Sequence, residues 1–361
     1  MLWFHRLNLV AGILCFCIVV FGAFVRLSDA GLGCPDWPGC YGQLTVPEQA
    51  HEVARAQAQY PQRPVEAPKA WKEMIHRYLV GGLSTLIVVL AVLSRFIDAA
   101  PRRLPFAILA LLVFQALLGM WTVTWKLMPL VVTGHLLGGM TTFALLLWMW
   151  LAGRYALAQA RAEAQAAPEP ERRAPRNERE AWTQMADTST DDAPLPQRPT
   201  GLIALASLAL GLLALQIYLG GWTSSNYAAL ACPDLPTCQG HWLPPLDIAD
   251  AFRPWRGLGI SYEHGVLNNV ARMTIHFFHR CGALLVTFAV LLLAAALRLR
   301  GHRRLAHPPL AALGLQLLLG ISIVLLRLPL PLAVAHNAGA ALLLAALVWV
   351  NFQLRNPAQA A

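Results

Sequence analysis

A short cysteine-proline motif occurs twice in the chain, and this repeat constrains the fold more than any other feature. The pattern Cys-Pro-Asp-x-Pro-x-Cys runs from Cys34 to Cys40 and again from Cys232 to Cys238. The histidines that follow the first copy recur roughly 200 residues later, after the second copy. Such regular spacing is typical of a duplicated unit, so we expect two similar halves.

Long apolar runs fill most of both halves. Hydrophobic residues make up 57% of the 361 residues and charged residues only 13%, whereas soluble domains carry about 25% charged residues. Each run is near the roughly 20 residues that a helix needs to cross a membrane. The sequence therefore predicts an all-α integral membrane protein, with eight transmembrane helices in two pseudo-symmetric four-helix bundles. The runs cover residues 7–27, 75–96, 104–125, 129–152, 201–222, 274–297, 305–326 and 329–352.

Polar segments divide the chain into parts. Residues 154–200 are rich in Ala, Gln, Glu, Arg and Pro and lack apolar periodicity, which predicts a disordered cytoplasmic linker. The linker separates an N-terminal half, 1–153, from a C-terminal half, 201–361. In the first half, the segment between Pro47 and Tyr60 is amphipathic and predicts a short surface helix. We expect the second cysteine loop, about 223–272, to fold over the outer surface as a lid.

The positive charges indicate an orientation in the membrane. The net charge is +9, but the arginines are concentrated in particular loops between the apolar runs rather than on one continuous face, so we expect no nucleic-acid partner. Their positions place both termini in the cytoplasm and both cysteine loops in the periplasm of a bacterial-type inner membrane. In that oxidising compartment each pair, Cys34 with Cys40 and Cys232 with Cys238, can form a disulfide. The pairs would serve as structural links or, alternatively, exchange electrons with a thiol partner.

Four histidines lie at similar depth in the outer part of the predicted helices. They are His76 and His135 in the first half, and His279 and His336 in the second. A single histidine in a membrane helix is usually a hydrogen-bonded packing residue, but two matched pairs of costly polar residues favour a function. Neutral imidazole binds iron well, and ligands on facing helices can hold a porphyrin between them. We therefore expect one heme site in each half.

Charged residues beside these histidines differ between the halves. Arg77 and Arg280 directly follow histidines, and a guanidinium could bind heme propionates through two parallel hydrogen bonds; the alternative is a side chain that only reaches the membrane surface. Glu73 precedes His76 by one helical turn, whereas the second half has His276 at the corresponding position. A carboxylate beside only one cofactor predicts that the first half is reactive and the second transfers electrons. Alternatively, Glu73 is a solvated acid at a helix start.

Taken together, these residues resemble the heme A synthase family, membrane oxidases that convert heme O to heme A. The resemblance implies two pseudo-symmetric four-helix bundles, oxidation of a porphyrin methyl group to a formyl, and heme b as a cofactor. It also implies that His279 and His336 bind heme b iron, while His76 and His135 hold heme O beside Glu73. His276 leaves open which second-half histidine is the ligand, and His279 fits better because it aligns with His76. The matching segments are Val25-Arg26-Leu27, both cysteine motifs, Glu73 to Arg77, His135 to Gly138, His279-Arg280 and His336.

Other functions are compatible with parts of the pattern. One is a bis-histidine cytochrome b that transfers electrons from quinol, and another is a thiol-disulfide membrane oxidoreductase that uses the cysteine pairs. A third is a heme-delivery or oxidase-assembly protein that leaves heme unchanged. The synthase resemblance implies heme O synthase and cytochrome oxidase assembly factors as partners, with an electron donor that the sequence does not identify. A homo-oligomer is compatible with the sequence.

Overall fold

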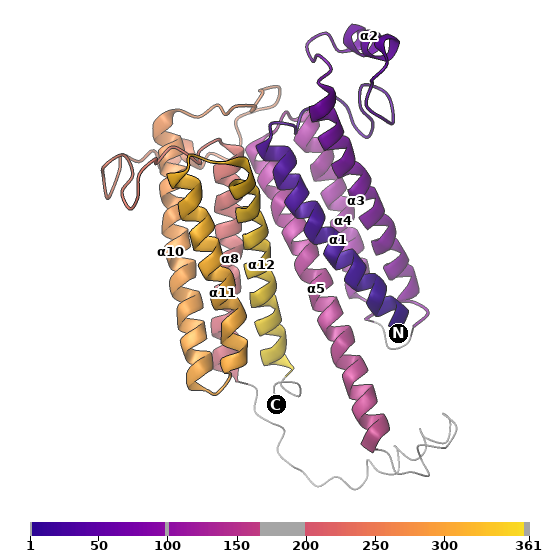
Figure 1. Ribbon diagram of the computed structural model, residues 1–361, viewed down its shortest axis with the longest axis vertical. Helices are drawn as coiled ribbons and strands as arrows, with labels where there is room; N and C mark the ends of the chain where they lie inside the picture. Colours follow the sequence, from indigo (N-terminus) through magenta and orange to yellow (C-terminus); the bar gives the residue numbers. More distant parts are fainter. Residues whose placement is uncertain (1, 98–100, 167–198, 357–361) are drawn as a thin grey trace.

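The structure is a computed structural model that describes residues 2–97, 101–166 and 199–356. Within these ranges, eight helices are long and apolar enough to cross a membrane, and they run side by side in Figure 1. All eight predicted apolar runs are confirmed as helices. They are α1 (Leu2–Leu27), α3 (Ala67–Leu93), α4 (Leu104–Thr124), α5 (Pro129–Ala166), α8 (Thr200–Ser225), α10 (Asn269–Leu299), α11 (Arg303–Leu325) and α12 (Leu330–Arg355).

Helices of each half pack mainly against one another. In the first half, α1 contacts α3 and α5, and α4 contacts the same two helices. In the second half, α8 contacts α10 and α12, and α11 contacts the same two. The halves meet where α12 packs on α1 and α5 and where α5 packs on α8. Since α12 touches both α1 and α5, it is the most central helix of the second half.

The predicted surface helix is confirmed as α2 (Ala50–Gln59), which lies in the first cysteine loop above the long helices in Figure 1. Glu52 begins it as part of a capping box, in which its carboxylate accepts from the backbone of Gln49 at 3.1 Å. A second short helix, α9 (Ile248–Ala251), was not predicted. Asp247 starts it by accepting a hydrogen bond from the Asp250 amide at 3.0 Å.

The prediction that the chain loses regular structure after residue 153 is wrong for its first part. Helix α5 continues to Ala166, beyond the apolar run predicted at 129–152. Residues 154–166 contain mainly Ala with Gln and Arg, which have high helix propensity even without apolar periodicity. The prediction took the polar composition and the loss of periodicity of 154–200 as signs of disorder and so missed this extension. The rest of the predicted linker up to 198 lies outside the described residues.

The second cysteine loop crosses onto the first half, which agrees with the predicted lid. Tyr262 is almost fully buried and packs with Leu127 and Met128, in the turn between α4 and α5. Its backbone amide donates to the Lys126 carbonyl at 3.0 Å. Arg63 of the first loop also forms an ion pair of 3.1 Å with Glu263. These contacts hold the end of the first half against a segment that the second half supplies.

A hydrogen-bonded arginine joins the two halves at the same end. Arg26, in the last turn of α1, donates to the Ser224 carbonyl at 2.9 Å and to the Tyr227 hydroxyl at 3.2 Å. Its guanidinium also lies over the Tyr227 ring, 4.4 Å from the centroid. Asp29 accepts from the same hydroxyl at 3.4 Å. The end of α1 is therefore fixed to the end of α8.

Candidate functional site

Each of the four predicted histidines packs its ring against a glycine on a neighbouring helix. His76 of α3 faces Gly22 of α1, and His135 of α5 faces Gly119 of α4. A Cβ added at these glycines would lie 2.9 Å and 3.4 Å from the Cε1 atoms of the two rings. The second half repeats the contact, with 3.2 Å for His279 against Gly220 and 3.1 Å for His336 against Gly320. At Gly22 a Cβ would force the His76 ring to shift, at Gly220 and Gly320 the ring would have to move slightly, and at Gly119 a Cβ would be in ordinary van der Waals contact.

The histidines form two pairs, one in each half. His76 lies on α3 and His135 on α5, while His279 lies on α10 and His336 on α12. All four side chains are partly buried. The Nδ1 atoms of His76, His135 and His336 are buried and have no hydrogen-bond partner among the described residues. A buried imidazole nitrogen without a partner is costly in an apolar environment.

These residue types could hold a heme in each half. Neutral imidazole is a good iron ligand, and each half offers two imidazoles from different helices. The glycines opposite the rings allow helices to approach closely, as small residues do in membrane helix packing.

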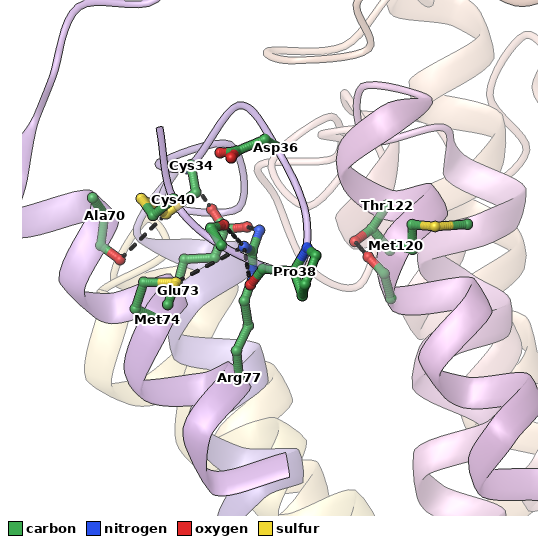
Figure 2. A network of polar contacts seen from close by, with 12 residues as sticks. Cys34, Asp36, Pro38, Cys40, Ala70, Glu73, Met74, Arg77, Met120 and Thr122 are labelled. Carbon is green, nitrogen blue, oxygen red and sulfur yellow. Dashed lines mark hydrogen bonds and ion pairs between the residues drawn. A yellow bond between two sulfur atoms is a disulfide. The ribbon is translucent and has the colours of Figure 1, made fainter. Parts of the chain in front are cut away.

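Glu73 anchors the first cysteine loop to α3. Figure 2 shows its carboxylate between the loop and the helix: Oε2 accepts from the Cys34 amide at 2.9 Å, and Oε1 accepts from Arg77 at 2.5 Å. The Glu73 side chain is only 7% exposed and that of Arg77 13%. Arg77 also donates to the carbonyls of Pro38, at 3.2 Å, and Gly39. This buried ion pair joins both ends of the cysteine ring to one turn of helix.

His276 takes the same position in the second half. Its Nδ1 lies 3.2 Å from the Cys232 amide nitrogen, and its Nε2 lies 3.3 Å from the Nε atom of Arg280. A neutral imidazole has one N–H, so it accepts from one of these two donors at a time. Arg280 also donates to the carbonyls of Cys232 at 2.7 Å and of Asp234 and Thr237 at 2.8 Å each. Both ring nitrogens of His276 therefore face the loop anchor, whereas the aligned His279 packs on Gly220 of α8.

Both cysteine pairs are disulfides, Cys34–Cys40 and Cys232–Cys238, as predicted. An aspartate inside each ring binds backbone amides that follow it. Asp36 accepts from Tyr41 at 2.6 Å and Gly42 at 2.7 Å, while Asp234 accepts from Gln239 at 2.6 Å and Gly240 at 3.0 Å.

Only the second ring adds a side-chain donor to this pattern. The Thr237 hydroxyl donates to Asp234, whereas the first ring has Gly39 at that place. The Thr237 hydroxyl and then the Gly240 amide lower the pKa of Asp234 from 3.8 to about 2. The second ring therefore holds its aspartate ionised to a lower pH than a free carboxyl.

The two arginines that the sequence nominated for propionates point to the cysteine loops. Arg77 bonds Glu73 and two loop carbonyls, and Arg280 bonds His276 and three loop carbonyls. A carboxylate is a stronger acceptor than a carbonyl, so a propionate could replace one of these partners. The geometry thus gives the arginines a structural role that the sequence pattern did not indicate.

Sequence reasoning missed the glycines opposite His76 and His279 and a glutamine beside His279. Gln216 of α8 contacts the Nδ1 atom of His279 at 3.1 Å and donates to its carbonyl at 2.9 Å. The spacing Gln-x-x-x-Gly would have found it, because Gln216 precedes Gly220 just as Gln316 precedes Gly320. Gln316 of α11 contacts the Nε2 atom of His336 on α12 at 3.3 Å.

An apolar groove of about 730 Å³ lies between α1 and α12, where the two halves meet. One of its residues, Phe21, stacks near His76 with ring centroids 6.4 Å apart. The groove offers no charged group, so it is suited to an apolar chain rather than to chemistry. Its lining comprises Phe16, Cys17, Val20, Phe21 and Phe24 of α1, and Leu330, Pro331, Val334, Ala335 and Ala338 of α12.

Comparison with known proteins gives consistent matches over most of the chain. The family model COX15-CtaA, described as cytochrome oxidase assembly protein, matches residues 5–348. A heme A synthase of Shewanella oneidensis is 47% identical over 355 residues, which cover 98% of this chain and 96% of that protein. Heme A synthases of Rhizorhabdus wittichii and Caulobacter vibrioides are 28% and 27% identical and cover 97% and 95% of this chain, with 93% of each relative covered.

Proposed function

The chain belongs to the COX15-CtaA family of cytochrome oxidase assembly proteins, and on that premise we propose that it is a heme A synthase that converts heme O to heme A. The main support for this function in the structure is the matched pair of histidines in each half, in which every ring lies against a glycine. A protein that only exchanged disulfides would have no use for these four polar residues in membrane helices.

We assign one heme to each pair. His76 and His135 would hold the substrate heme O, and His279 and His336 would bind heme b as the cofactor. The bound hemes supply the redox chemistry. His279 is the better second-half ligand because both ring nitrogens of His276 already face loop or arginine groups. As propionate partners, Arg77 and Arg280 would exchange loop carbonyls for carboxylates.

Glu73 is the proposed acid/base group of the reactive half. Oxidation of the methyl group of heme O to a formyl releases protons and develops positive charge beside the ring. A carboxylate in a low-dielectric site can stabilise that charge or accept a proton. Glu73 lies one turn before His76 and is held in place by the Cys34 amide and Arg77, so it is oriented before substrate arrives.

Replacing Glu73 with glutamine tests this role. Gln keeps an oxygen that can accept from the Cys34 amide but removes the charge, so Glu73→Gln should retain heme and lower conversion by about 100-fold or more. The measurement is chromatography and mass spectrometry of the hemes extracted from purified protein. The matched control is His276→Gln, at the same position of the second half, which should continue to make heme A. Heme A formed at the normal rate by Glu73→Gln would refute the role.

The same heme analysis separates the rival functions. A quinol-oxidising cytochrome b would contain heme b alone, and a heme-delivery protein would return heme unaltered. A thiol-disulfide oxidoreductase would lose turnover when either cysteine pair is replaced. Accumulation of heme A that depends on Glu73, together with activity after loss of the second cysteine pair, is the pattern expected of a synthase with structural disulfides.

We also propose that the two halves are pseudo-symmetric four-helix bundles, with boundaries at 1–153 for the substrate half and 201–361 for the heme b half. What supports this is that the four helices of each half contact one another in a closed ring. The connection between them, 154–200, would be a cytoplasmic linker that begins with the end of α5.

The orientation follows from the charged loops. Helix α1 begins and α12 ends at the side of the molecule opposite the cysteine loops (Figure 1). We propose that this side faces the cytoplasm of a bacterial-type inner membrane and that the cysteine loops face the periplasm. Heme O synthase as the substrate source and cytochrome oxidase assembly factors as acceptors are the proposed partners, with a separate electron donor. Self-association would leave both heme sites intact within one chain.

A further inference from the structure

One glutamine supports a histidine of the second half. On α8, Gln216 lies one turn before Gly220, the glycine that faces His279. The amide nitrogen of Gln216 is 3.1 Å from the Nδ1 atom of His279 and 2.9 Å from its carbonyl oxygen. Its Oε1 atom is buried and has no hydrogen-bond partner in the described chain. The amide group offers both a donor and an acceptor, and a protonated Nδ1, the form in which Nε2 is free to bind iron, would take the Oε1 atom.

The first half has an apolar pair at the corresponding place. On α1, Ile18 lies one turn before Gly22, the glycine that faces His76. Ile18 is 6% exposed, and Leu79 of α3 packs against the same apolar cluster. No side chain among the described residues hydrogen bonds the buried Nδ1 of His76. Two histidines that align in sequence therefore have different surroundings, one polar and one apolar.

The two differences depend on one another through volume. Gly282 follows His279 as Leu79 follows His76, three residues later. A Cβ at Gly282 would overlap the Oε1 atom of Gln216, so a larger residue there would force the glutamine amide to shift. In the first half, Leu79 stands at the position of Gly282 and Ile18 at the position of Gln216. The two halves therefore differ at both positions together, in polarity and in volume, around the aligned histidines.

The remaining two histidines do not repeat the arrangement at His279. In the second half, Gln316 of α11 contacts the Nε2 atom of His336 at 3.3 Å, and the Nδ1 atom of His336 is buried and has no partner among the described residues. In the first half, Gln115 of α4 lies against Gly138, and its Nε2 atom is buried and unbonded. Of the four paired histidines, only His279 has a side-chain contact at Nδ1 within the described part of the chain.

We propose that Gln216 is a positioning residue that fixes the ring of His279 for a resident heme, and that Ile18 with Leu79 leaves His76 free to exchange its heme. This inference rests on the proposed function, in which the first half must take up heme O and release heme A at every turnover. Hydrogen bonds to the second nitrogen of a histidine ligand orient its ring, and their loss typically lowers metal affinity about 10- to 100-fold. The presence or absence of one glutamine therefore separates a cofactor from a substrate.

The first test removes the hydrogen bond with little change in volume. Gln216→Met should speed transfer of heme b from the purified holoprotein to excess apomyoglobin about 10- to 100-fold. It should also shift the low-spin electron paramagnetic resonance signal of that heme, which a purely structural role would leave unchanged. The matched control, Gln115→Met, replaces a glutamine of the first half whose side-chain Nε2 is unbonded in the described chain, and it should leave both readouts of the heme b site as in the parent.

The second test introduces the glutamine and glycine of the second half at the corresponding positions of the first half. The double variant Ile18→Gln, Leu79→Gly copies the second-half pair and should slow release of the first-half heme to apomyoglobin about tenfold or more. Product heme A should then remain bound after conversion, so the yield per protein molecule falls toward one. The single variant Ile18→Gln, which keeps Leu79 at the position of Gly282, should release heme faster than the double variant.

Two results separate failure of this inference from failure of the proposed function. If His279→Ala leaves the low-spin heme b spectrum unchanged, His279 is not a ligand and the site assignment itself is overturned. If His279→Ala removes that spectrum but Gln216→Met transfers heme within twofold of the parent rate, only the role of Gln216 is overturned. Unchanged release from the Ile18→Gln, Leu79→Gly variant would likewise reject the explanation for exchange at His76.

Discussion

The two cysteine loops are anchored by the same arrangement with different charges. In the first loop, the Cys34 amide and Arg77 both bond the carboxylate of Glu73. In the second loop, the Cys232 amide and Arg280 both lie within hydrogen-bond distance of the imidazole of His276. The second anchor thus holds its loop without an anion, whereas the first places a carboxylate at the same position. A carboxylate is also the group that the proposed chemical role of Glu73 requires.

The arginines compensate for this difference. Arg77 faces a carboxylate and bonds two loop carbonyls, whereas Arg280 faces an imidazole and bonds three. Carbonyl oxygens carry only partial charges, so more of them are needed to stabilise a buried guanidinium when no anion is present. The first anchor thus depends on one charge pair and the second on a set of dipoles.

Removing the arginine should damage the first anchor more than the second. Arg77→Ala leaves the Glu73 carboxylate buried without its partner and should cost about 3–5 kcal/mol. Arg280→Ala leaves a neutral His276 and lost carbonyl bonds, so about 1–3 kcal/mol is expected. The measurement is the unfolding free energy in detergent for each variant.

A double variant identifies the source of the larger loss. Combining Arg77→Ala with Glu73→Gln removes the unpaired charge, so it should be more stable than Arg77→Ala alone. A double-variant cycle gives the coupling between the two side chains directly. Equal losses for the two arginines, with no recovery in the double variant, would contradict a charged first anchor and a neutral second one.

The sequence predicted the membrane helices and the disulfide rings but not the contacts by which Glu73 and His276 anchor the loops. Apolar runs of membrane length define the eight helices because a bilayer requires continuous apolar surface. Glu73 could be placed one turn before His76, and its lack of a second-half equivalent was visible. The Glu73 carboxylate accepts from the Cys34 amide because the loop returns over α3. Spacing along the chain does not specify that path of the loop.

The sequence was equally limited in predicting which residues surround the four histidines. The sequence located all four histidines, since these polar residues stand out in apolar helices. It did not show that each ring lies on a glycine of another helix, because that contact depends on the rotation of packed helices. Only the recurrence of Gln-x-x-x-Gly at Gln216 would have indicated it in advance.

The two disulfides should contribute equally, unlike the two arginines. Each closes a ring between cysteines six residues apart, and the stabilisation of a disulfide depends mainly on the length of chain it closes. Replacing Cys34 and Cys40 with serine, or Cys232 and Cys238, should therefore cost about 2 kcal/mol in each case. The unfolding free energy in detergent measures both.

The parent protein under reducing conditions is the control for the serine variants. It should lose about as much as the two double variants together, since the rings are separate and their effects should add. A much larger loss of unfolding free energy for one ring would show that its disulfide also stabilises structure outside the ring. The two loops would then differ in their disulfides as well as in their anchors.

The smallest expected effect concerns the aspartate of the second ring. Its pKa is lowered to about 2 from 3.8, chiefly by the Thr237 hydroxyl. A carboxyl with a lowered pKa in the folded state stabilises that state above the unfolded pKa, and the contribution is lost as pH falls toward the folded pKa. The second ring should thus keep its aspartate bonds down to about pH 2.

Thr237→Val removes the hydroxyl and should move the pKa of Asp234 up toward its ordinary value, so that the ring loosens at higher pH. Carbon-13 spectra of aspartate-labelled protein, recorded between pH 5 and pH 2 on the parent and on Thr237→Ser, which keeps the hydroxyl, measure the shift. If Thr237→Val and Thr237→Ser titrate together, the hydroxyl does not distinguish the second ring from the first.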